Sequence, residues 1–302
     1  MSRLVNSAIL IFLVALSGCS SPDLRTMEER QVKLDVQTFS TARRLGEAQK
    51  KLRVATINLA HGRKESINQW FVSAAKTRKN LDDIAAYLQA ENVDVVALQE
   101  ADGPSRWSGN FDHVLYLAEQ ARYPYYVYTE HEAQWMGHYG TAILSRWPIS
   151  EGLGLTYAKS PPTTSKGFSL GSIQWQAGQE SLSEIDVVSV HLDFSRESVR
   201  KQQIDEMVDV LSKRARPLVI MGDFNSEWLA KEYLVQNSAD AKRLHVYDPG
   251  SLVLDTYKDK RLDWILLSYP LVFDSYQVEQ KMLSDHRIVI ADISWPAPEG
   301  AP

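Results

Sequence analysis

Cysteine is almost absent from this chain of 302 residues, which contains only Cys19. A single cysteine excludes an internal disulfide. If the protein is exported to an oxidising compartment, its stability must therefore come from packing and hydrogen bonding alone. The position of Cys19, directly after an apolar stretch, also leaves no spare thiol for chemistry elsewhere in the chain.

A hydrophobic run long enough to span a membrane is also missing from the N-terminal region. The apolar stretch from Ala8 to Leu16 is shorter than the roughly 20 residues that a spanning helix needs. It follows the charged Arg3 and precedes the small residues Ser17 and Gly18. This order of charged, apolar and small residues is typical of a secretory signal. The sequence Leu-Ser-Gly-Cys that ends at Cys19 resembles the lipobox of bacterial lipoproteins, and Ser20 is typical of sorting to the outer membrane.

We therefore expect a signal peptide over residues 1–18 and a lipidated Cys19 followed by a polar linker to residue 50. This arrangement places the protein in the cell envelope, attached to the outer membrane through its lipid and facing the periplasm. The domain itself is expected over residues 51–296, followed by a short tail over 297–302. A monomer is the expected state.

An excess of positive charge is the third feature that the chain lacks. Its formal net charge is −5, so it has no overall attraction for nucleic acid, whose nonspecific binding depends on Lys and Arg. Internal repeats and long low-complexity tracts are absent as well. What is present is a composition of 44% hydrophobic and 24% charged residues, which is typical of a globular domain.

Short apolar runs alternate with two helical patterns along the domain. The helices are expected within 77–90 and 198–214, where apolar residues recur every three or four positions. Uniformly apolar runs indicate strands covered on both faces. We therefore predict an α/β (α+β) four-layer sandwich, in which two mixed β-sheets pack face to face with helices outside. The expected strands are 52–59, 93–99, 141–145, 185–192, 217–221, 264–267 and 288–293.

Polar residues stand at the ends of these strands. Gly222-Asp223-Phe224-Asn225 follows a buried run, and alternation in an extended segment predicts that Asp223 and Asn225 point to the same side. Burying charges beside so much apolar sequence requires partners or a metal. The remaining strand-end residues of this kind are Glu100, His191, Asp263, Asp285 and His286.

In order along the chain, the segments Thr-Ile-Asn58, Leu-Gln-Glu100, His191-Leu, Gly-Asp223-Phe-Asn225, Leu-Asp263-Trp and Ser-Asp285-His286 resemble the endonuclease/exonuclease/phosphatase (DNase I-like) superfamily. The segment 139–146, Tyr-Gly-Thr-Ala-Ile-Leu-Ser-Arg, is similar to another common stretch of that family. The resemblance covers residues 51 to about 293. It implies the same four-layer sandwich and a metal-dependent phosphoester hydrolase.

The resemblance also implies roles for the metal-binding residues. Glu100 is expected to bind Mg²⁺ or Mn²⁺ with help from Asn58, while Asp285 completes or adjusts the coordination. Mg²⁺ prefers a few carboxylate oxygens together with water and substrate phosphate, so this small set is chemically sufficient.

The expected catalytic residues are His191, Asp223, Asn225, Asp263 and His286. Asp263 is expected to orient His286, Asp223 to position the attacking water, and Asn225 to donate a hydrogen bond to the phosphate. Whether Asp223 or His286 removes the proton stays open. His191 is expected to be a second phosphate donor or the general acid.

The expected substrate is a phosphodiester in the cell envelope, either a phospholipid head group or a smaller molecule. The first alternative is a secreted nuclease that scavenges nucleic acid, and a less favoured one is an inactive binding lipoprotein. The position of His191 resembles the DNase I-like, sphingomyelinase-like and inositol-phosphatase-like branches, which disfavours DNA repair. We expect the loops 61–76, 102–110 and 160–167 to form the rim of the cleft.

Overall fold

The computed structural model describes residues 28–29, 35–36, 41–43, 48–69, 72–134, 137–177, 182–227, 243–248, 250–251 and 253–296. The expected signal peptide, Cys19 and the tail 297–302 lie outside these residues, as does most of the expected linker. No helix within the described residues is long and apolar enough to cross a membrane.

Within the described residues, fourteen strands form two sheets of seven strands each. In spatial order, sheet A contains β1 (Glu28–Glu29), β7 (Ile149–Thr156), β8 (Gly167–Trp175), β9 (Ser183–His191), β10 (Leu218–Asp223), β12 (Asp263–Ser268) and β11 (Leu244–Val246). Sheet B contains β13 (Val272–Val278), β14 (Val289–Ser294), β3 (Lys51–Asn58), β4 (Val95–Asp102), β6 (His138–Ser145), β5 (Tyr125–Ala133) and β2 (Asp35–Val36).

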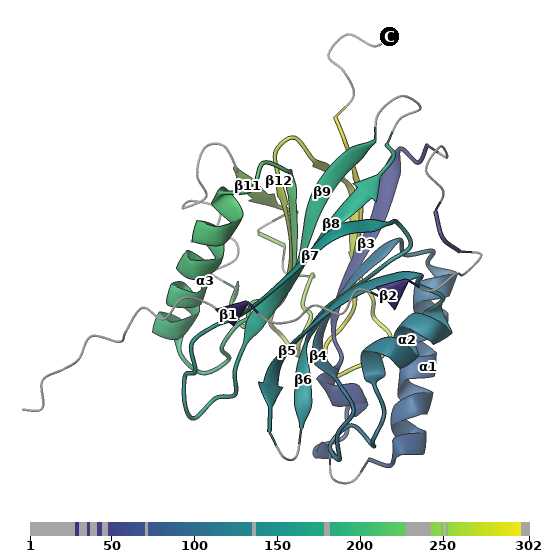
Figure 1. Ribbon diagram of the computed structural model, residues 1–302, viewed down its shortest axis with the longest axis vertical. Helices are drawn as coiled ribbons and strands as arrows, with labels where there is room; N and C mark the ends of the chain where they lie inside the picture. The colour runs from purple at the N-terminus through teal and green to yellow at the C-terminus, as the bar shows by residue number, and fades with distance from the viewer. Residues whose placement is uncertain are drawn as a thin grey trace, which may run out of the picture.

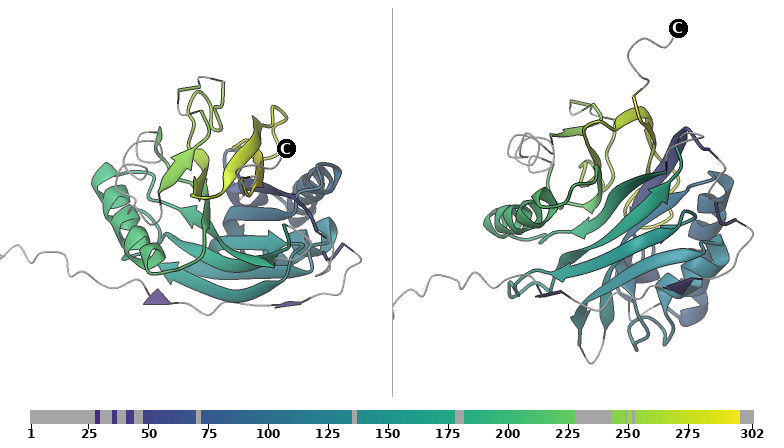
Figure 2. Two further views of the ribbon diagram at one scale, coloured as in Figure 1. Left: turned by 90° about the horizontal axis from the view of Figure 1, so that it is seen from above. Right: turned by 45° about the horizontal axis from the view of Figure 1, so that its top comes forward.

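The helices lie on the outer faces of the two sheets. Helices α1 (Ala74–Ala90) and α2 (His113–Ala121) cover sheet B, whereas α3 (Glu197–Ser212) covers sheet A on the opposite side (Figures 1 and 2). A short 3₁₀ turn, η1 (Ala60–Gly62), follows β3. The predicted four-layer sandwich of two mixed sheets with outer helices is therefore confirmed.

Alternation of side chains explains why the central strands are apolar throughout. In β10, Val219 and Met221 pack between the two sheets, while Leu218 and Ile220 pack against α3. Neighbouring residues of a strand point to opposite faces, so a strand with a core on each side must be apolar at every position.

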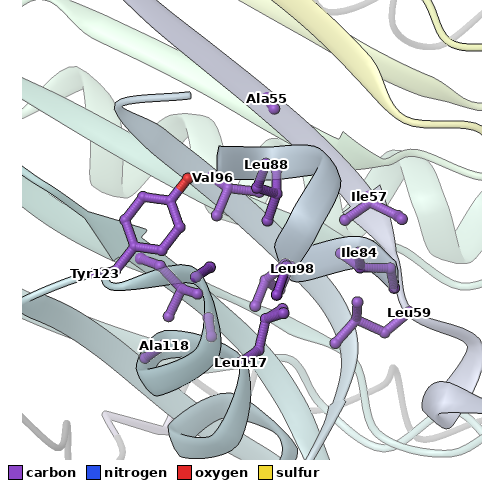
Figure 3. Close-up of a cluster of buried hydrophobic side chains, with 14 of the residues drawn as sticks. Ala55, Ile57, Leu59, Ile84, Leu88, Val96, Leu98, Leu117, Ala118 and Tyr123 are labelled. Atoms are coloured by element: carbon purple, nitrogen blue, oxygen red, sulfur yellow. The ribbon is translucent and has the colours of Figure 1, made fainter. Parts of the chain in front are cut away.

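In the core between sheet B and its helices, the buried residues of α1 recur every three or four positions, as expected for one face of a helix. Leu81, Ile84 and Leu88 of α1 face Ile57 and Leu98 of the sheet, and Figure 3 shows part of this cluster. Ser73 begins the helix, since its side chain accepts a hydrogen bond from the backbone N–H of Lys76 at 3.2 Å.

Two parallel strand pairs determine where the site forms. Strand β3 pairs in parallel with β4, and β9 with β10, while all other neighbours are antiparallel. A parallel pair needs a long crossover connection, which α1 and α3 provide. The carboxyl ends of each pair then lie at one edge of its sheet.

All seven predicted strands and both predicted helices are present, with ends shifted by a few residues. Several elements that the prediction omitted are short or are interrupted by glycine. Helix α2 spans only nine residues, and β7 contains two glycines within Ile-Ser-Glu-Gly-Leu-Gly-Leu-Thr. The omitted elements are β5, β7, β8, β11, β13, α2 and the two-residue strands β1 and β2.

Candidate active site

The predicted site residues converge on one edge of the sandwich. Asn58, His191 and Asp223 are the last residues of β3, β9 and β10. Asp263 opens the antiparallel strand β12 and lies directly opposite Asp223. A cavity of about 260 Å³ lies at this edge, and its lining residues are Asn58, Arg63, Glu100, His191, Phe194, Asp223, Asn225, Tyr257, Leu262, Asp285 and His286.

A bulge in β4 places Glu100 in this cavity. The pairing of β4 with β6 shifts register between Leu98 and Ala101, and Glu100 within the bulge has a φ of 47°. A bulge redirects a side chain relative to the regular alternation of the strand. Burial alone would raise the pKa of Glu100, but the charges of His61, His191 and Lys166 lower it to about 2.

The turn after β10 differs from the extended geometry that we expected for Asp223 and Asn225. Asn225 has a left-handed backbone with a φ of 50°, and its N–H donates to Asp223 Oδ1 at 2.9 Å. Asp and Asn favour such local side-chain hydrogen bonds over an extended chain. The two side chains reach the cavity through this turn, where Asn225 Nδ2 also donates to the carbonyl of Leu192 at 3.0 Å.

Gly222 allows the same turn to pack closely on β9. A Cβ atom at this position would lie 2.0 Å from the carbonyl oxygen of Val190, and its φ of 147° is unfavourable for other residues. Glycine is therefore required here for Asp223 to stay in register with His191.

Asp263 and His286 form the carboxylate–imidazole pair that the sequence predicts. Nδ1 of His286 lies 2.7 Å from Asp263 Oδ2, and both residues are buried. Burial would lower the pKa of His286, but Asp263 more than offsets this effect and raises the pKa to about 10. His286 therefore presents a positive charge to the cavity in this arrangement.

Three side-chain nitrogens lie near one oxygen of Asp223, and the amide of Asn58 is the one that donates a hydrogen bond to it. Asn58 Nδ2 donates to Asp223 Oδ2 at 3.0 Å, while Nε2 of His191 lies 3.7 Å and Nε2 of His286 lies 4.0 Å from the same oxygen. Burial and the nearby charge of Asp263 raise the pKa of Asp223 to about 7. By contrast, burial and the charge of Lys166 lower the pKa of His191 well below its ordinary value.

The three predicted metal ligands line the cavity but have different protein partners. Asn58 Oδ1 accepts from the N–H of Ala60, and Asp285 Oδ2 accepts from Arg63 at 2.7 Å. Asp285 Oδ1 is buried with no hydrogen-bond partner among the described residues. An ionised Glu100, an amide oxygen and an unpaired carboxylate oxygen form a set of hard donors that fits a divalent cation such as Mg²⁺.

A second group also has the composition of a metal site. Oxygens and a nitrogen of Asp223, Asp263 and His286 lie within 4.8 Å of one another. In the part of the chain that the structure describes, no other group of three such side chains meets this criterion. These residues were predicted as catalytic, so the assignment of Asn58, Glu100 and Asp285 as ligands stays a prediction.

Two residues near Glu100, His61 and Lys166, were not among the predicted site residues. His61 has its Nε2 3.2 Å from Glu100 Oε2, and its Nδ1 lies 2.7 Å from Asp102 Oδ1. Burial would lower the pKa of His61, but Asp102 and Glu100 raise it. His61 follows the Asn58 motif by three residues, which is the one signal in the sequence that pointed to it.

Lys166 is a further residue that the sequence indicated only as part of the expected rim loop 160–167. It is buried, and its Nζ lies 3.5 Å from Nδ1 of His191. Burial lowers its pKa, while the nearby carboxylates of Glu100 and Asp223 oppose that effect. Its position at the end of a polar loop predicts exposure, and only the tertiary fold covers it.

Residues in and beside the family-like segment 139–146 lie outside the cavity. Arg146 is buried with its guanidinium 5.7 Å from the ring centre of Tyr123, and His138 contacts Glu130. Tyr139 lines a neighbouring pocket rather than the cavity itself.

An ordered set of carboxylates, imidazoles and amides around a cleft between two sheets defines a polar site suited to an anionic ester. The family model for the endonuclease/exonuclease/phosphatase family matches residues 55–286, which is more than half of the chain. The chain belongs to this family. Among curated proteins, no match to the sequence was found.

Solved structures share the fold at low sequence identity. An endonuclease/exonuclease/phosphatase family protein from Leptotrichia buccalis is 17% identical with a TM-score of 0.61, covering 81% of this chain and 100% of its own. The human Nocturnin catalytic domain with bound sulfate is 17% identical with a TM-score of 0.63, covering 88% and 98%. A mannosyl-6-phosphatase from Bacteroides thetaiotaomicron is 15% identical with a TM-score of 0.54, covering 81% and 100%.

Proposed function

We propose that this protein is a divalent-metal-dependent phosphodiesterase that acts on a phospholipid head group or another small phosphodiester. The observation that carries the proposal is the convergence of Asn58, His191 and His286 on Asp223 at the joined ends of both sheets. Donors so arranged match the several oxygens of a phosphoryl group. Membership of a phosphoesterase family supports the same reaction class.

In the proposed reaction, Asp223 orients a water molecule by accepting one of its hydrogens. The water oxygen forms a bond to phosphorus, and the opposite phosphorus–oxygen bond breaks. His286, held by Asp263, places its positive charge beside a phosphoryl oxygen, and the amide of Asn225, which lines the same cavity, donates a hydrogen bond to the phosphate. The attacking water loses one proton, the departing oxygen takes up one, and the products are a phosphomonoester and an alcohol.

Asn58, Glu100 and Asp285 would hold the cation, with Mg²⁺ or Mn²⁺ as the proposed metals. When bound, it supplies polarisation of a phosphoryl oxygen and offsets negative charge that develops during attack. The free oxygen of Asp285 and the ionised carboxylate of Glu100 support this assignment.

The cell envelope is the proposed setting, with a lipid on Cys19 holding the protein at the outer membrane. The order of charge, apolar residues and cysteine in residues 1–20 supports this placement. The net charge of −5 supports a small or lipid substrate over nucleic acid. A monomer acting at the membrane surface is the proposed state.

The test measures hydrolysis of choline phospholipid, bis-p-nitrophenyl phosphate, plasmid DNA and RNA by the purified full chain. With Mg²⁺ present we expect turnover of the lipid and of the aryl diester, and EDTA should abolish both. Glu100→Ala should lower turnover on the order of 100-fold or more, because it removes a proposed metal ligand. Glu119→Gln, an exposed change on α2, is the matched control and should retain full activity.

Three results would contradict this proposal in different ways. Rapid degradation of DNA without cleavage of lipid or small diester would identify a nuclease. Absence of turnover with every substrate, alongside normal folding, would identify a binding protein. Unchanged activity in EDTA, or in Glu100→Ala, would show that the metal assignment is wrong.

A further inference from the structure

A second pocket is lined by His61, whose ring contacts Glu100 of the active-site cavity. Its volume is about 150 Å³, and it forms where three loops meet β5 and β6. These loops correspond to the segments expected at the cleft rim. The lining residues are His61, Trp107, Glu132, Gln134, Gly137, Tyr139 and Thr164.

Aromatic rings form most of the wall. The rings of His61 and Trp107 have centres 5.6 Å apart and planes at 87°, and those of His61 and Tyr139 have centres 4.8 Å apart and planes at 78°. These three rings are partly exposed rather than closed into the core. Rings at such angles surround a space with both faces and edges, so a compact group can contact several of them at once.

The wall also carries negative charge. Glu132 is held in place because its Oε2 accepts a hydrogen bond from the N–H of Ser165 at 2.7 Å. Burial alone would raise the pKa of Glu132, but hydrogen bonds from Ser165 and Gln134 lower it, so the carboxylate is ionised at neutral pH. Both ring nitrogens of His61 face carboxylates, those of Asp102 and Glu100, which offset any charge on that ring.

The pocket and the active-site cavity are adjacent through one pair of side chains. His61 lines the pocket, Glu100 lines the cavity, and His61 Nε2 lies 3.2 Å from Glu100 Oε2. A substrate with its phosphate in the cavity could extend past this pair and place a second group in the pocket.

We propose that the aromatic pocket binds the organic ammonium group of a phosphoester substrate, of the kind found in choline esters. A cation gains from aromatic faces and from a carboxylate together, and quaternary ammonium ions are recognised in this way. A neutral apolar group would gain nothing from the charge of Glu132. This inference rests on the proposed phosphodiesterase function, because it names the substrate class of the same site.

The test compares two aryl diesters that differ at one atom. One is p-nitrophenylphosphorylcholine, and the other is its 3,3-dimethylbutyl analogue, in which carbon replaces the charged nitrogen. We expect the native chain to prefer the choline ester in kcat/KM by about tenfold, mainly through KM. Glu132→Gln and Trp107→Leu should each reduce this preference to about twofold or less, while Glu119→Gln keeps it.

Equal kcat/KM values for the two esters in the native chain would overturn the inference and leave the phosphodiesterase proposal intact. Full preference in both variants would overturn it as well. Glutamine retains an acceptor for the N–H of Ser165, and circular dichroism will verify that each variant folds. If no ester is hydrolysed, calorimetric titration with choline decides: binding that Glu132→Gln abolishes supports the pocket, and no binding to the native chain overturns it.

Discussion

Glu100 lies between two groups of side chains that differ in origin. The group that we call the catalytic cluster, Asp223, Asp263 and His286, comes from strand ends of sheet A and the loop before β14. The group that we call the His61 bridge, His61 and Asp102, comes from the 3₁₀ turn and the end of β4, beside Glu100 itself. One group spans both sheets, whereas the other lies wholly at the edge of sheet B, beside the carboxylate that it contacts.

The histidines of the two groups also differ in the partners of their ring nitrogens. His286 pairs with a single carboxylate and points its other nitrogen towards Asp223 in the cavity. His61 has a carboxylate at each nitrogen and so has no free nitrogen for substrate. From this comparison we propose that His286 acts on the substrate directly, and that His61 acts by positioning Glu100.

The largest effect is expected for His286→Ala, within the catalytic cluster. Its removal takes away the positive charge beside the phosphoryl oxygens and leaves Asp263 buried without its partner. We expect kcat for bis-p-nitrophenyl phosphate to fall on the order of 10²–10⁴-fold, as measured by steady-state kinetics. His245→Ala, on the edge strand β11, is the matched control and should stay within about twofold. A loss below tenfold in His286→Ala would contradict a direct role.

An intermediate effect is expected in the His61 bridge. His61→Ala should lower activity and Mn²⁺ affinity by about 10–100-fold, because residues that orient a metal ligand typically contribute that much. Mn²⁺ binding can be measured by electron paramagnetic resonance, independently of turnover. His61→Gln keeps a donor near Glu100 and should recover part of the affinity. Unchanged Mn²⁺ affinity in His61→Ala would show that the bridge is only structural.

The smallest effect is expected for Tyr139→Phe, which keeps the ring of the aromatic pocket and removes its hydroxyl group. The pocket contact with His61 uses the ring, so kcat/KM should change by less than about threefold. The free energy of unfolding in urea should fall by about 0.5–1.5 kcal/mol, the usual contribution of one hydrogen bond. A large kinetic loss would show that the hydroxyl group itself takes part in the reaction.

The difference between the two groups also explains what the sequence could reveal. Asp223, Asp263 and His286 follow or precede apolar strands, so the strand pattern predicted their positions, and the resemblance to the family predicted their convergence. His61 has no such pattern, since its backbone is left-handed with a φ of 54° in a short turn. Lys166 looks like an exposed loop residue until the fold buries it.

The fold shows the same division between strong and weak local patterns. Strands buried on both faces, such as β10, were recognisable because every position is apolar. Strand β8 reads Gly-Phe-Ser-Leu-Gly-Ser-Ile-Gln-Trp, and its small and polar residues are buried by neighbouring strands rather than by their own hydrophobicity. The Asn225 turn was mispredicted because a local hydrogen bond to Asp223 outweighs extension of the chain.

The hydrogen bond between Asn58 and Asp223 joins residues that are 165 positions apart in the chain. Contacts between such distant residues form slowly, because a long loop must close before they contribute. The α1 and α3 units can each acquire local structure without this contact. We therefore expect catalytic competence to arise late in folding, so that recovery of activity reports the docking of the two halves rather than the formation of either one.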